Sequence, residues 1–145
     1  MRVYEYTFSR HRVADVDIRT VSSPKDMHAI VAPAFDGAES ERMVVAMLNT
    51  RNGVIGLETV YVGSVNQSQV RIGELFRSAV RLNATSIILA HNHPSGDDMP
   101  SPDDLHLTAE AIAAGRLLDI RVLDHIVVAD GGFASLRDRG IAFDR

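Results

Sequence analysis

Two histidines separated by one residue, His91 and His93, are the side chains best suited to do chemistry in this sequence. In an extended chain, residues i and i+2 point to the same side, so both imidazoles can meet one ion. An apolar segment, 85–90, precedes them and predicts a buried strand that fixes their backbone. Asp104 falls in the first turn of the next expected helix, from which its carboxylate can return to the same point. Two histidines, one carboxylate and a water make an open, catalytic zinc site rather than a closed, structural one.

Each of these residues also has an ordinary structural interpretation. A bare His-x-His is more often a pair of surface histidines, and Ser101 with Asp104 has the spacing of a helix capping box. Helix capping and metal binding are compatible here, because Ser101 can cap the helix while Asp104 binds the ion. His125 lies in an apolar segment, where we expect a structural or supporting histidine rather than a fourth ligand. Asn92 is expected to point away from the metal.

The remaining histidines, His11, His28 and His106, have no partners at ligand spacing, and we expect them at the surface. The chain has no cysteine, which excludes disulfides, cysteine nucleophiles and cysteine-bound zinc. Its net charge of −4 disfavours non-specific nucleic-acid binding. No apolar run reaches the about 18 residues of a membrane span, and the first ten residues do not form a signal core. These features predict a cytoplasmic protein with no membrane partner.

Apolar periodicity and turn residues predict alternating strands and helices along the 145 residues. Strands are expected at 3–8, 43–48, 54–62, 85–90, 122–129 and 133–136, and the turn Asn52-Gly53 joins the second to the third. Helices are expected from the Ser23 cap to about residue 35, at 73–83, and from Ser101 to about Arg116. We therefore expect an α/β fold of the α+β type, a single mixed sheet with flanking helices.

The segment around the two histidines resembles the JAMM (MPN-type) metalloprotease motif, which is His-x-His-Pro, six residues, then Ser-x-x-Asp. His91, His93, Pro94, Ser101 and Asp104 all fall in register. The flanking segments 90–97 and 123–128 resemble one branch, the RadC family. The similarity runs from about residue 20 to the C-terminus, so we expect one domain over 1–145, with 1–20 as an N-terminal strand extension.

The resemblance implies a Zn²⁺ cofactor and hydrolysis of an amide or isopeptide bond in a peptide or protein substrate. The motif includes an upstream glutamate that takes a proton from the attacking water and passes it to the leaving amine. Counting back from Leu48-Asn49-Thr50 gives Glu41, with Glu39 as the alternative. Ser101 would assist the developing oxyanion.

Two other hypotheses belong to different classes. The first is a DNA-repair-associated or nucleic-acid-processing protein, since RadC relatives often carry an N-terminal helix-hairpin-helix region thought to contact DNA. The first twenty residues here do not resemble such a region, and the acidic charge disfavours a nucleic-acid partner. The second is an MPN domain that binds proteins without catalysis, and the complete ligand set argues against it.

Overall fold

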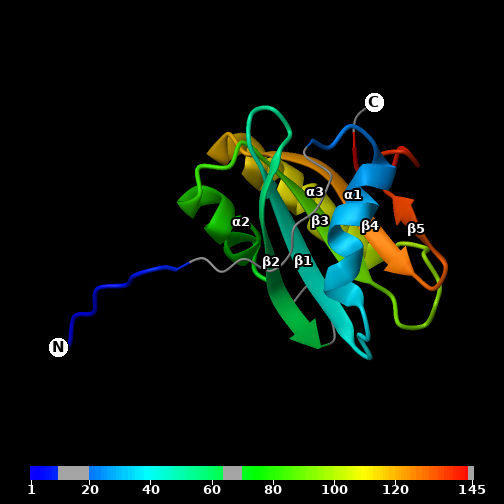
Figure 1. The fold of residues 1–145 in the computed structure, drawn as a ribbon, viewed down its shortest axis with the longest axis horizontal. Helices are drawn as coiled ribbons and strands as arrows, with labels where there is room; N and C mark the ends of the chain where they lie inside the picture. The colour runs from blue at the N-terminus through cyan, green and yellow to red at the C-terminus, as the bar shows by residue number, and fades with distance from the viewer. Residues whose placement is uncertain (10–19, 64–69, 144–145) are drawn as a thin grey trace.

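A five-stranded mixed sheet in the order β2-β1-β3-β4-β5 forms the centre of the molecule (Figure 1). The computed structural model describes residues 1–9, 20–63 and 70–143. The strands are β1 (Glu41–Leu48), β2 (Val54–Gly63), β3 (Ser86–Asn92), β4 (Arg121–Ala129) and β5 (Gly132–Ser135). The helices are α1 (Pro24–Val31), the 3₁₀ turn η1 (Ala32–Phe35), α2 (Ile72–Arg81) and α3 (Pro102–Leu118). The α+β fold expected from the sequence is confirmed.

Helices cover both faces of this sheet. Alternate residues of β1 pack on opposite sides: Met43 and Val45 face α2 and α3, while Val44 and Ala46 face α1. All of β3 is buried, because it lies in the middle of the sheet and both of its faces are covered. This explains why the central strands have continuous apolar sequences rather than alternating ones.

Strand β3 is antiparallel to β1 and parallel to β4. A parallel pair needs a crossover connection, which α3 provides by packing across the sheet between the two strands. The ends of β3 and β4 therefore lie together at one edge, next to the start of α3. Strand β3 also continues further than expected, since Asn92 pairs with Val128 of β4, so His91 lies inside the strand rather than at the start of a loop.

The expected strand at residues 3–8 is wrong. Residues 1–9 form no strand, and the side chains of Val3, Tyr4 and Tyr6 are exposed. Figure 1 shows this segment extending away from the sheet. Local alternation of apolar residues is not sufficient for a strand, because the backbone also needs a pairing partner. The segment contacts α2, where the Arg81 guanidinium lies 3.1 Å from the centre of the Phe8 ring.

The rest of the expected N-terminal extension, residues 10–19, lies outside the described residues. In the described part of the chain, no helix combines the length and apolar character needed to cross a bilayer.

A glycine lets α3 end against the strand that follows it. A Cβ built on Gly115 would lie 2.3 Å from the carbonyl oxygen of Ile120, and the Ile120 amide donates to the Gly115 carbonyl at 2.9 Å. Asp119 between them is left-handed, with φ at 56°. The chain thus reverses tightly into β4, the strand that carries His125.

We expect Gly115→Ala to lower the free energy of unfolding by about 1–3 kcal/mol, because backbone must move to admit the methyl group. The matched control is Gly73→Ala in α2, where no atom lies within 4 Å of the added Cβ. That change should be neutral or stabilising by up to about 1 kcal/mol, because alanine favours helix. Urea denaturation measures both variants, and equal effects would contradict this account of Gly115.

Candidate metal centre

Three side chains with ligand atoms converge at the edge where β3 ends. His91, His93 and Asp104 offer nitrogen and oxygen atoms that all lie within 4.8 Å of one another. The Nε2 atoms of the two histidines are 2.9 Å apart. Asp104 Oδ1 is 3.2 Å from His91 Nε2, and Asp104 Oδ2 is 3.2 Å from His93 Nε2. The three residues that the sequence singled out therefore meet at one point.

This donor set fits a divalent cation. Two imidazole nitrogens and a carboxylate are ligands that zinc accepts, and they come from separate elements that aim them inward. Two ring nitrogens this close repel each other when both present lone pairs, unless a proton or a cation lies between them. The cluster can thus hold a metal ion, and its chemistry favours a nitrogen-binding one over calcium or magnesium.

His93 follows β3 in a short turn that fixes its ring. The His93 amide donates to the Val128 carbonyl of β4 at 2.9 Å, and the Gly96 amide donates back to the His93 carbonyl at 3.0 Å. Gly96 has φ at 88°, a conformation that glycine adopts without strain. The His93 Nδ1 is 2.8 Å from the Asp97 carbonyl, which can only accept a hydrogen bond. Nδ1 therefore carries a proton.

Asp104 has both of the roles considered from the sequence. Its backbone amide donates to Ser101 Oγ at 3.1 Å, and its Oδ2 accepts from the Ser101 amide at 2.7 Å, which completes the capping box. The same carboxylate also faces the two histidines. Burial raises the pKa of Asp104, but the interactions of its carboxylate with the His91 and His93 rings outweigh this effect and hold the pKa well below its usual range.

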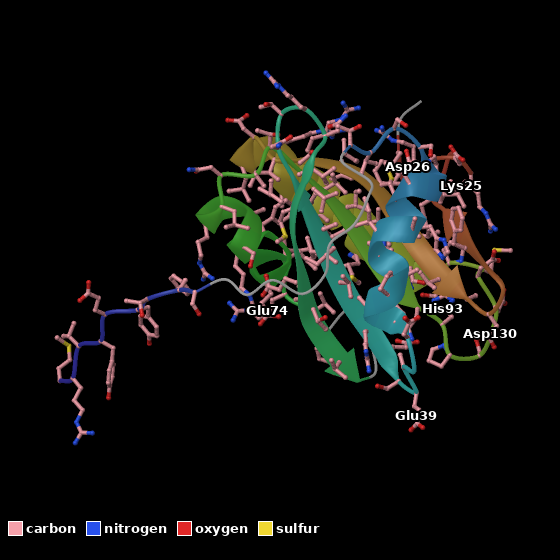
Figure 2. All side chains as sticks on the ribbon, in the orientation of Figure 1. Lys25, Asp26, Glu39, Glu74, His93 and Asp130 are labelled. Carbon is pink, nitrogen blue, oxygen red and sulfur yellow. The ribbon has the colours of Figure 1, made fainter. Side chains whose placement is uncertain are left out.

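The electrostatics of the cluster also involve Glu41. The hydrogen bond to Asp104 raises the pKa of His93 against the effect of burial, and the charge of Glu41 acts in the same direction. Met43 is paired with His91, so the same register extended by two residues brings Glu41 opposite His93. Glu41 is half-buried, whereas Glu39 is exposed. Figure 2 shows Glu39 projecting outward before β1, away from His93. Of the two glutamates, Glu41 is the one beside the cluster.

Asn92 has a role that sequence reasoning missed. Its side chain points away from the cluster, as expected, and it is 6% exposed. Its Oδ1 accepts from the Arg42 amide at 2.7 Å, and its Nδ2 donates to the Ser40 carbonyl at 3.1 Å. Asn92 thereby fixes the backbone on both sides of Glu41. In His91-Asn92-His93, the outer residues face the cluster and the middle residue anchors the neighbouring strand.

His125 lies behind His91 rather than in the cluster. It is fully buried, and its Nε2 is 2.7 Å from His91 Nδ1. Its other nitrogen, Nδ1, is 2.6 Å from the hydroxyl of Thr108, a residue that sequence reasoning did not consider. Burial holds the pKa of His125 well below its ordinary value, which keeps the ring neutral. The expectation of a structural or supporting histidine agrees with this position.

The expectation that the other histidines lie at the surface holds only in part. His106 is exposed and lies 3.2 Å from Glu110 on the next turn of α3. His28 is half-buried and stacks on Phe133 of β5, with ring centroids 4.4 Å apart. The expectation that His28 lies free at the surface is therefore wrong. His11 lies outside the described residues.

Comparison with known proteins identifies the class. A family model described as the RadC-like JAB domain matches residues 21–141, and the chain belongs to this family. It is 50% identical over 123 residues to a UPF0758 protein of Roseiflexus castenholzii, which covers 85% of this chain and 53% of the relative. A UPF0758 protein of Chloroflexus aggregans is 45% identical over 124 residues, which are 86% of this chain and 54% of the relative. A UPF0758 protein of Methanosarcina mazei is 40% identical over 122 residues, which are 84% of this chain and 53% of the relative.

The chain thus spans about half the length of the curated relatives it matches. The match includes every residue of the cluster together with Glu41, Asn92, Thr108 and His125. The RadC resemblance drawn from the motif is confirmed.

We expect Asn92→Ala to lower the free energy of unfolding by about 1–3 kcal/mol, because it removes two part-buried hydrogen bonds, to the Arg42 amide and the Ser40 carbonyl, each contributing about 0.5–1.5 kcal/mol. Asp98→Ala is the control from the same part of the chain, where the aspartate forms an exposed ion pair with Arg139. That change should cost less than about 0.5 kcal/mol. Thermal or urea unfolding measures both, and an Asn92→Ala protein as stable as the control would contradict the anchoring role.

Proposed function

We propose that this domain is a zinc-dependent hydrolase that cleaves a peptide or isopeptide bond. The observation that carries the proposal is the convergence of His91, His93 and Asp104, with the Glu41 carboxylate beside them. Three protein ligands would leave one position of a bound zinc ion for a water, which is a property of catalytic rather than structural zinc sites. Membership of the RadC-like JAB family supports the same class.

Each residue has a distinct part in this proposal. His91, His93 and Asp104 hold the metal, which when bound lowers the pKa of a water and polarises the substrate carbonyl. Glu41 accepts the proton of the attacking water and returns it to the leaving amine nitrogen. Ser101 donates its hydroxyl proton to the developing oxyanion. The Ser101 oxygen accepts from the Asp104 amide, and a hydroxyl that accepts a hydrogen bond still has its own proton to donate.

The charge around the cluster favours a peptide over a nucleic acid as substrate. The loop that follows His93 has Asp97 and Asp98, and Asp103 lies in the first turn of α3. Asp130 approaches the same loop, 3.6 Å from a Cβ built on Gly96. A phosphodiester backbone would meet these carboxylates as like charges. A peptide, and above all one with basic residues, would not.

Metal content is the first test. Purified protein should contain about one zinc ion per chain by elemental analysis, and His93→Ala should lose most of it, because two ligands hold zinc poorly. His106→Ala removes an exposed histidine from the same helix as Asp104 and should keep full zinc content. Well-folded wild-type protein that takes up no zinc, even when zinc is supplied, would overturn the proposal.

Hydrolysis is the second test, measured with fluorogenic peptides and with lysine-isopeptide-linked peptides, beside single-stranded and duplex oligonucleotides. Glu41→Gln should lower the rate of peptide cleavage by about 10²- to 10⁴-fold while zinc content stays unchanged. Glu39→Gln makes the same change two residues away and should leave the rate unaltered.

Other results of these assays contradict the proposal. Cleavage of oligonucleotides alone indicates a nucleic-acid-processing enzyme. A zinc-loaded protein that cleaves nothing indicates a domain that binds without catalysis.

A further inference from the structure

A buried hydrogen-bond chain lies behind the metal centre and joins two of its residues. It runs from the Asp104 carbonyl to the Thr108 hydroxyl, on to His125 and then to His91. Thr108 and His125 are 0% exposed and His91 is 1% exposed. We infer that Thr108 and His125 are positioning residues that set the tautomer of His91, so that its Nε2 presents a lone pair to the metal. This inference rests on the metal site of the proposed function.

The direction of the buried hydrogen-bond chain follows from the single proton of Thr108. Thr108 Oγ1 lies 2.6 Å from the Asp104 carbonyl oxygen and 2.6 Å from His125 Nδ1. A carbonyl oxygen cannot donate, so the proton in the first contact must come from Thr108. Without that proton, two oxygen lone pairs would face each other at 2.6 Å. The hydroxyl therefore donates to Asp104, and it must accept from His125 Nδ1.

The rest of the buried hydrogen-bond chain is then determined. A neutral His125 with its proton on Nδ1 has a lone pair on Nε2. His91 Nδ1 lies 2.7 Å from this atom and so must donate to it. A neutral His91 with its proton on Nδ1 has its lone pair on Nε2, the atom that faces His93 and Asp104. One helix carbonyl thus decides the protonation of a histidine on β3.

The opposite direction would leave the site unable to bind metal through His91. If Thr108 donated to His125, His125 would donate to His91 Nδ1, and the proton of His91 would move to Nε2. That proton would occupy the position of the metal. The first contact of the buried hydrogen-bond chain, Thr108 with the Asp104 carbonyl, excludes this arrangement.

The fold holds these groups in place from three elements. Thr108 lies one turn after Asp104 on α3, so the same turn of helix carries a ligand and the start of the buried hydrogen-bond chain. The backbone of His125 is fixed by its amide, which donates to Asp124 Oδ1 at 2.7 Å, and by its carbonyl, which accepts from Leu136 at 3.0 Å. The Asp124 carboxylate is itself held by Ser135.

Nuclear magnetic resonance of uniformly ¹⁵N-labelled, metal-free protein at pH 8 tests the inference without any variant. Long-range ¹H–¹⁵N correlation distinguishes the two tautomers of each ring. We expect the proton of His91 on Nδ1 and that of His125 on Nδ1. A proton on His91 Nε2 in the wild-type protein would overturn the inference.

Variants supply the functional readout. Thr108→Val keeps the shape and removes the hydroxyl, so zinc affinity, measured by competition with a chelator, should fall by about 10- to 100-fold. Thr108→Ser restores the hydroxyl and should restore both the affinity and the His91 tautomer. Thr59→Val, at an exposed position on β2, is the control and should match the wild-type protein. Wild-type affinity and tautomer in Thr108→Val would overturn the inference.

These measurements use zinc alone and no substrate, so they separate the two proposals. If Thr108→Val weakens zinc binding but no bond is hydrolysed, the inference stands and the proposed function fails. If the protein is an active zinc hydrolase and Thr108→Val changes neither measurement, only the inference fails.

Discussion

Backbone pairing of β3 on both of its edges is the constraint on which the rest of the site depends. Strand β1 lies on one side and β4 on the other, and helices cover both faces, so β3 has no freedom to shift register. A slip of one residue would turn His91 away from α3 and bring Asn92 to the cluster. The backbone hydrogen bonds that pair β3 with β1 and β4 thus also determine which side chains lie next to Asp104.

The fold was largely predictable because its signals are local. Ser23 followed by Pro24 marks the start of α1, and Asn52-Gly53 marks the β1–β2 turn. The prediction for segment 3–8 was wrong, since its alternation of apolar residues has the pattern of a strand while the segment pairs with no strand in the described residues. Pairing depends on where other parts of the chain lie, and short-range periodicity does not contain that information.

The candidate site was predictable to the extent that its residues are close in sequence. His91, His93 and Asp104 lie close together in the sequence, from the end of β3 to the first turn of α3, and their spacing predicts a cluster that the structure contains. The anchoring role of Asn92 escaped notice because its partners are backbone atoms of Ser40 and Arg42, which any residue type supplies. Thr108 escaped notice in the same way, since one of its two partners is the backbone carbonyl of Asp104. A position that matters through main-chain contacts leaves no pattern in the residues it contacts.

The parallel pairing of β3 and β4 has a consequence for how the protein folds. Parallel strands cannot pair until the whole connection between them, here the loop and α3, has been made and packed. Contacts this distant along the chain are costly in entropy and form slowly. His91 meets His125 only through that pairing, whereas it meets His93 two residues away. During synthesis the chain therefore acquires its metal-ligating residues and Thr108 first, and His125, which completes the contact to His91, follows later with β4.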